Sequence, residues 1–115
     1  MNIPDKVKIG GFNYNVIKKT RVNKGDVEVD GEIFYDQCEI VLRDNMEQAQ
    51  DYKEMVLLHE CLHGIFFSMG LKQDDEGLIS SLGKGLHVFI KDNPNIFKES
   101  DPIGNEESSK SDHKE

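Results

Sequence analysis

The N-terminal part of the chain shows the two-residue alternation of polar and hydrophobic positions that is typical of β-strands. Residues 5–9 alternate in this way, and residues 12–17 do so again after two consecutive glycines. Two glycines between alternating segments favour a tight turn, so residues 5–19 are predicted to form a β-hairpin. The following stretch, residues 18–30, is mostly polar and is predicted to be a loop.

A second pair of alternating segments follows this loop. Residues 31–35 and 38–42 flank a turn at Asp36-Gln37, and they predict a second hairpin. Together the two hairpins give a small antiparallel sheet of three to four strands. The side chains expected in its core are Ile33, Tyr35, Cys38, Ile40 and Leu42.

The pattern then changes to helical periodicity. A first helix is expected to begin between Asp44 and Asp51, where Asp44 and Glu47 have the spacing of a capping box. It is expected to end at Gly70, because glycine is preferred at the left-handed position after a helix. Leu71 would then complete a Schellman cap.

A second helix is predicted from about Asp75 to Lys91, and Asp92-Asn93-Pro94 ends it. Its glycines weaken it in isolation but permit close approach to the first helix. The expected fold is therefore α+β, a small antiparallel sheet packed on two main helices. The apolar positions of the second helix are Leu78, Ile79, Leu82, Leu86, Phe89 and Ile90, and its glycines are Gly77, Gly83 and Gly85.

Length and composition limit the possible classes of protein. The 115 residues are enough for one domain, expected at residues 1–97, and residues 98–115 are expected to be a disordered acidic tail. The net charge of −8 argues against a nucleic-acid partner, which would need a basic surface. Cys38 and Cys61 are expected to be reduced thiols, since two cysteines in this setting suggest no disulfide framework.

The sequence also bears on location. The first residues do not show the basic region followed by an apolar region that is typical of a signal peptide. No apolar run approaches the length that spans a bilayer. The expectation is a cytoplasmic protein with no membrane partner.

The strongest chemical signal is the segment His59-Glu60-Cys61-Leu62-His63, which has the pattern H-E-x-x-H within an apolar run. Side chains four residues apart share one face of an α-helix, so His59 and His63 can bind one metal ion. Glu60 lies beside the first histidine and can act as a general base without binding the metal. Burying two histidines and a glutamate on an apolar helix would be costly without a shared role. The pattern therefore predicts a catalytic Zn²⁺ site.

A catalytic zinc site needs a third protein ligand. Glu76 is the preferred candidate, followed by Asp75, because Glu76 lies on the side of the second helix expected to face the first. Acids in a first helical turn are also favoured by capping and by the helix dipole, whatever the function. Asp74 is a further acid at this helix start. His87 shares the face of Glu76 but lies about 16 Å further along the axis, which makes it a poorer candidate.

Zinc at this site predicts hydrolysis of a peptide bond. The metal would lower the pKa of water toward about 7 and polarise the carbonyl. Glu60 would take the proton as general base and pass it to the leaving amine. Three residues are open candidates for stabilising the negative oxygen opposite the metal: Tyr35, Tyr52 and His87.

The order of these elements resembles that of a zincin metallopeptidase. The similarity covers about residues 5–97. It rests on Leu57-Leu58-His59-Glu60-Cys61-Leu62-His63-Gly64, on the strand Glu39-Ile40-Val41-Leu42 and on the helix opening with Asp75-Glu76. The chain is most similar to minimal metallopeptidases of bacteriophages and mobile elements, related to the ImmA/IrrE-like group, although Glu76–Leu82 matches that group only loosely.

The resemblance implies a zinc-dependent endopeptidase of bacterial or phage origin, with its substrate laid along the sheet edge above the motif helix. Some members of the group cleave a repressor, which implies a regulatory protein as substrate. The alternative is a zinc-binding module that binds a peptide or protein without cleaving it. A structural zinc site needs no general base and is usually closed by four ligands, commonly including cysteine. Glu60 therefore favours the peptidase.

Overall fold

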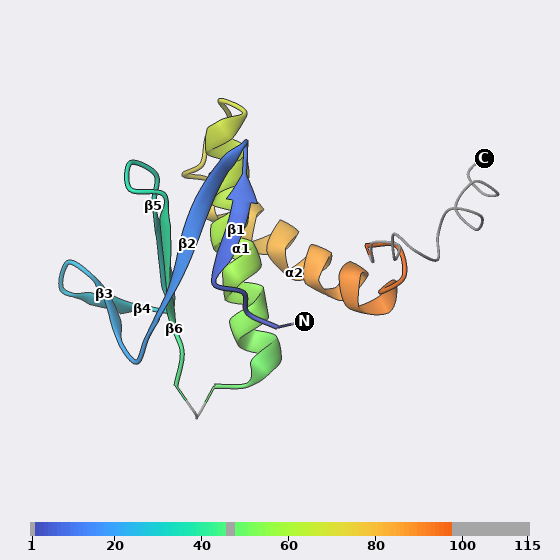
Figure 1. Cartoon of the computed structure of the whole chain (residues 1–115), viewed down its shortest axis with the longest axis horizontal. Helices are drawn as coiled ribbons and strands as arrows, with labels where there is room; N and C mark the ends of the chain where they lie inside the picture. Colours follow the sequence, from blue (N-terminus) through green and yellow to red (C-terminus); the bar gives the residue numbers. More distant parts are fainter. Residues whose placement is uncertain (1, 46–47, 98–115) are drawn as a thin grey trace.

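The structure is a computed structural model that describes residues 2–45 and 48–97. The predicted α+β class is confirmed: a four-stranded sheet and a two-stranded hairpin accompany two helices (Figure 1). The predicted tail at 98–115 and Glu47 of the predicted capping box lie outside the described residues. The elements are β1 (Lys6–Ile9), β2 (Phe12–Lys19), β3 (Val22–Lys24), β4 (Val27–Val29), β5 (Gly31–Phe34), β6 (Glu39–Arg43), α1 (Gln50–Ser68) and α2 (Glu76–Asp92).

The main sheet has the strand order β1-β2-β6-β5. Both predicted hairpins are confirmed, since β1 pairs antiparallel with β2 and β5 pairs antiparallel with β6. The prediction of a wholly antiparallel sheet is wrong at its centre, where β2 and β6 run parallel with Val16 opposite Ile40. Alternation shows which side chains share a face of a strand, but it does not specify the neighbouring strand or its direction.

The predicted loop at residues 18–30 is wrong in part. It contains the hairpin of β3 and β4, with Val22 opposite Val29 and a turn at Gly25, whose φ is +64°. Val22 is buried, at 5% exposure. Each strand is only three residues long, and its valines are surrounded by polar residues. An alternation this short is not distinguishable from a polar loop in the sequence, which is why the strands were not predicted.

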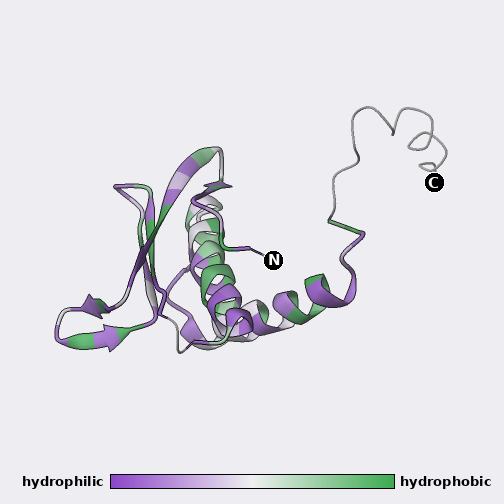
Figure 2. Ribbon diagram, turned by 60° about the horizontal axis from the view of Figure 1, so that its bottom comes forward, coloured by the Kyte–Doolittle hydropathy of each residue, from purple (hydrophilic) through white to green (hydrophobic). Residues whose placement is uncertain are grey.

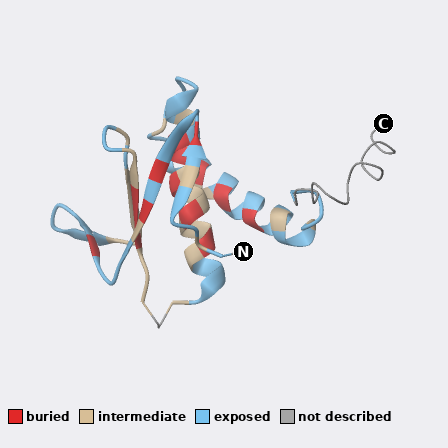
Figure 3. Cartoon of the chain, viewed as in Figure 1, coloured by how far each residue is buried: buried red, intermediate tan, exposed pale blue. Residues whose placement is uncertain are grey.

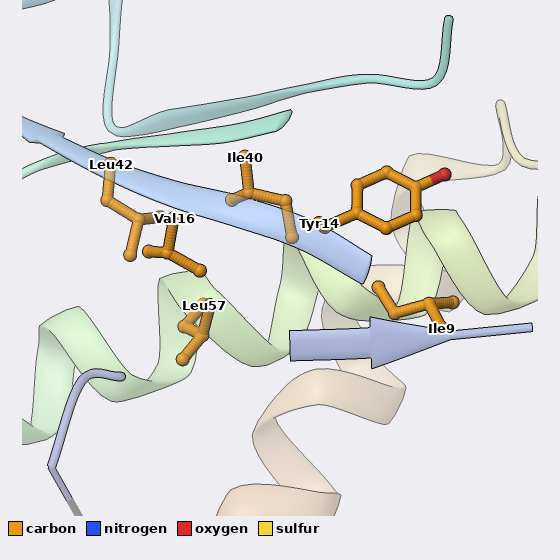
Figure 4. Packing of buried hydrophobic residues seen from close by; sticks show 6 residues of the cluster. All are labelled: Ile9, Tyr14, Val16, Ile40, Leu42 and Leu57. Atoms are coloured by element: carbon orange, nitrogen blue, oxygen red, sulfur yellow. The ribbon is translucent and has the colours of Figure 1, made fainter. Parts of the chain in front are cut away.

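The core lies between the main sheet and α1, where strands and helix contribute a common cluster (Figure 4). Ile40 and Leu42 belong to this cluster as predicted, whereas Ile33, Tyr35 and Cys38 are only partly buried. Buried positions concentrate on β2, β6 and α1 (Figure 3). The cluster consists of Ile9, Tyr14, Val16, Ile40, Leu42 and Leu57.

The two ends of α1 differ in how well they were predicted. The helix begins within the predicted range, but Ala49 is the N-cap and no side chain caps it. Asp44 instead bonds to the Lys53 ammonium at 2.6 Å, so its predicted capping role is wrong. The Schellman cap is confirmed, because the Leu71 N–H donates to the carbonyl of Phe66 at 2.8 Å and Gly70 has φ +74°.

The second helix, α2, packs on α1 and runs away from the sheet (Figure 1). Ile79 is fully buried, and a Cβ at Gly83 would lie 3.7 Å from His59 Cα, so Gly83 is the only predicted glycine at the crossing. The predicted apolar face is right only in part. Hydrophobic segments recur along the ribbon of α2 (Figure 2). Four of the predicted apolar residues are 37–49% exposed, namely Leu78, Leu82, Leu86 and Phe89.

Candidate metal centre

Helix α1 presents His59 and His63 on one face, one turn apart. Their Nε2 atoms are 3.2 Å apart, and their rings meet edge to face. Glu76, the first residue of α2, reaches both rings: its Oε1 lies 3.0 Å from His59 Nε2 and its Oε2 lies 2.8 Å from His63 Nε2. The structure therefore brings together three side chains that the sequence singled out, from two helices.

The start of α2 separates Glu76 from its neighbours. Asp75 is the N-cap of α2, and its side chain accepts a hydrogen bond from the Leu78 N–H at 3.1 Å. A carboxylate used in this way stabilises the helix end. Asp74 lines the adjoining cleft but is not among the converging ligand atoms. The acid that faces the histidines is thus Glu76, and Asp75 has a capping role.

The donor set fits a metal ion. Tetrahedral zinc with bonds of about 2.0–2.1 Å to nitrogen places its ligand atoms about 3.3 Å apart. The two histidine Nε2 atoms are 3.2 Å apart, and each lies 2.8–3.0 Å from a different oxygen of the Glu76 carboxylate. Burial lowers the pKa of His59, although Glu76 acts in the opposite direction. The lowered pKa favours the neutral imidazole, which is the form that binds metal.

Glu60 lies beside this group but on the α1 face that meets the sheet. A Cβ at Gly31 would lie 3.3 Å from Glu60 Cγ and 2.9 Å from Val56 Cγ1, so β5 passes directly over this part of α1. Glu60 is consequently 7% exposed. Burial, reinforced by the carboxylates of Glu76 and Glu32, raises the pKa of Glu60 to about 8. A cation bound close by would favour its charged form.

These residues line a cleft of about 840 Å³ between β5, α1 and the start of α2. This volume lies within the usual range for ligand sites, about 300–1,000 Å³. The cleft walls include the hairpin residue Lys24 and, from α2, Ser80 and Lys84. His59, Glu60, His63 and Glu76 all face the same cleft, so a molecule bound there can reach the metal ligands and the buried glutamate together.

The three candidates for oxyanion stabilisation lie in different surroundings. Tyr52 lines the cleft, but its hydroxyl donates to the Asp30 carboxylate, and this hydrogen bond is the main cause of the raised pKa of Tyr52. His87 does not line the cleft, and its Nε2 lies 2.9 Å from Glu54 Oε1. Tyr35 lines the cleft.

A second group, Asp51, Glu54 and His87, could also hold a metal ion, with ligand atoms within 4.8 Å of one another. Both oxygens of Asp51 already contact the Lys91 ammonium, at 3.0 and 2.9 Å. The sequence analysis did not single out Glu54. A usable signal was present, because Glu54 is an acidic residue one turn before the apolar Leu58, on the side of α1 that meets α2. The contacts of Asp51 with Lys91 and of Glu54 with His87 make this group a polar network between the two helices.

Comparison of the chain with protein-family models, with curated proteins and with solved structures finds no match. Among the residues that the structure describes, no helix is long and apolar enough to cross a membrane. Functional inference therefore depends on the geometry of the site.

Proposed function

We propose that this protein is a zinc-dependent endopeptidase. The observation that carries the proposal is the convergence of His59, His63 and Glu76 in the lining of a cleft, with the buried Glu60 beside them. Two imidazole nitrogens and one carboxylate are a ligand set of catalytic zinc sites, which leave the fourth position open. A purely structural site would be closed and would have no use for Glu60.

His59, His63 and Glu76 would hold the zinc ion, which when bound polarises the scissile carbonyl and makes water more acidic. Glu60 takes a proton from the attacking water as the new C–O bond forms. It then gives this proton to the amine nitrogen as the C–N bond breaks, so that the carboxylate is regenerated. The burial of Glu60 beneath β5 keeps its carboxyl group in one position for both transfers.

The edge of the sheet suggests how a peptide would bind. Strand β5 pairs with β6 on one side and is the last strand of the main sheet, and Gly31, Glu32 and Ile33 line the cleft. An extended peptide can add to such an edge through main-chain hydrogen bonds. Its backbone would then run above α1 with a carbonyl group near the metal ligands. The proposed substrate is therefore an extended segment of a protein.

The test compares the parent with Glu60→Gln and with Asp74→Asn, which removes a carboxylate from the same cleft. Each zinc-loaded protein is incubated with peptides from a digested bacterial proteome, and mass spectrometry identifies new termini. Glu60→Gln should keep its zinc and its melting temperature while cleaving about 10²–10⁴-fold more slowly, because glutamine cannot accept the proton. Asp74→Asn should cleave at a rate close to the parent's.

Equal cleavage by Glu60→Gln and the parent would show that the general-base mechanism is wrong. If the parent binds zinc and cleaves no peptide, the protein is a zinc-binding interaction module instead. Retention of peptides on the immobilised protein would then identify what it binds.

A further inference from the structure

Tyr35 is held firmly at the end of β5. It stands in the turn between β5 and β6, and its carbonyl accepts a hydrogen bond from the Cys38 N–H at 3.3 Å. Cys38 adopts the left-handed conformation with φ +53°, which closes the turn. The backbone of Tyr35 is therefore fixed by local geometry, and its side chain projects from a defined point at the rim of the cleft.

The ring of Tyr35 is fixed as well, because it stacks on Phe67 with ring centroids 4.2 Å apart and planes inclined by 15°. Phe67 follows His59 and His63 at the same spacing of four residues, so all three share one face of α1. Phe67 lies four residues, or about 6 Å along the helix axis, beyond His63, and the Tyr35 ring is stacked beside this next turn of the same face.

Among the described residues, the polar group of Tyr35 differs from those of the other two candidates in having no hydrogen-bond partner. In the described part of the chain it makes no hydrogen bond, whereas Tyr52 is bound to Asp30 and His87 to Glu54. Burial raises the pKa of Tyr35 to about 12, and the Glu60 and Glu76 carboxylates contribute to the rise. At neutral pH the group is therefore a hydrogen-bond donor, and Tyr35 lines the same cleft as Glu60 and Glu76.

We propose that the Tyr35 hydroxyl donates a hydrogen bond to the oxygen of the bound molecule that carries negative charge beside the His59–His63–Glu76 site. The proposal rests on the proposed function, in which this oxygen is the scissile carbonyl oxygen as water adds to it. The proton stays on the phenol, and no bond to tyrosine forms or breaks. A donor already in place costs no reorganisation when the charge develops, and removing one such donor typically lowers kcat by about 10²–10³-fold.

The test uses Tyr35→Phe, which keeps the ring that stacks on Phe67, and Tyr52→Phe as the matched control from the same cleft. The first measurement is steady-state cleavage of a peptide that the parent cleaves. Tyr35→Phe should lower kcat by about 10²–10³-fold with little change in KM, zinc content or melting temperature. Tyr52→Phe should lower kcat far less than Tyr35→Phe does, because the Tyr52 hydroxyl already donates to Asp30.

The second measurement needs no cleavage. Acetohydroxamate, a small chelating anion, is titrated into each zinc-loaded protein by calorimetry. Its affinity should fall about tenfold in Tyr35→Phe, as expected for loss of a hydrogen bond to a charged oxygen, and should fall much less in Tyr52→Phe, whose hydroxyl already has Asp30 as its partner. If the parent cleaves nothing, the peptidase function fails, and this measurement still decides the role of Tyr35. Unchanged acetohydroxamate affinity in Tyr35→Phe, or loss of its zinc, would overturn the proposal.

Discussion

Glu54 of α1 and His87 of α2 form a buried pair in which His87 Nε2 lies 2.9 Å from Glu54 Oε1. Their side chains are only 3% and 6% exposed. The contact joins the same two helices that Glu76 joins to the histidines, at a point about three turns further along α2. Two polar contacts at separated positions fix both the rotation and the translation of α2 on α1, and so help to determine where Glu76 lies.

The first prediction concerns the contribution of the Glu54–His87 pair to stability at low pH. Burial alone would raise the pKa of Glu54, but hydrogen bonds, including those from His87 and Gln50, lower it overall. A lowered pKa means that ionised Glu54 contributes stability above its unfolded-state pKa, and that this contribution disappears as the pH falls through the folded-state value. We therefore expect the free energy of unfolding to fall between about pH 5 and pH 3 more steeply in the parent than in Glu54→Gln.

Urea unfolding across this pH range measures the difference. Because the two proteins share all other carboxyl groups, the change in the gap between their curves isolates Glu54. At neutral pH, Glu54→Gln should be less stable by about 1–3 kcal/mol, since glutamine can still bond to His87 but carries no charge. Parallel curves for the two proteins would show that the pair does not contribute in this way.

The second prediction concerns the metal ligands. The protein should bind about one zinc per chain, and Glu76→Ala should weaken binding by at least ~100-fold because it removes one of three ligands. Asp75→Ala should keep the zinc affinity but lose about 1 kcal/mol of stability, because it removes the N-cap of α2. Competition with a chromophoric chelator gives the affinities. A larger loss of affinity in Asp75→Ala than in Glu76→Ala would reassign the ligand.

The third prediction concerns the close approach of β5 to α1. A Cβ at Gly31 would lie 2.9 Å from Val56 Cγ1, so Gly31→Ala should push β5 outward and destabilise the protein by about 1–3 kcal/mol. Gly85→Ala is the matched control, because a Cβ there meets nothing within 4 Å, and alanine should stabilise α2 by about 0.5–1 kcal/mol. Thermal unfolding of Gly31→Ala and Gly85→Ala measures these two changes in stability. Equal effects would mean that β5 does not press on α1.

Much of the fold was predictable because its signals are local. The hairpin turn at Gly10 and Gly11, the Schellman cap at Gly70 and the start of α2 at Glu76 depend on neighbouring residues, which the sequence displays directly. The parallel pairing of β2 with β6 depends on where the chain returns after β5. No local pattern contains that information.

The same distinction applies to the site. The spacing of His59 and His63 places them on one helical face without knowledge of the fold, and Glu76 was singled out because it begins the next helix on the side expected to face the first. The sequence could not distinguish Tyr35 from Tyr52, since the difference lies in their partners, Phe67 for one and Asp30 for the other. The exposure of Leu82 and its neighbours on α2 was missed because hydrophobic periodicity marks an apolar face without showing how much of it another element covers.

The central parallel pair also affects the order in which the domain folds. Strands β2 and β6 are far apart in the sequence, and bringing them together costs chain entropy before side-chain packing compensates for it. The helices α1 and α2 are neighbours joined by a short connection, so their contact is local and can form earlier. Because the three candidate zinc ligands all lie on this helix pair, we expect zinc to stabilise the transition state and to accelerate refolding, in addition to slowing unfolding.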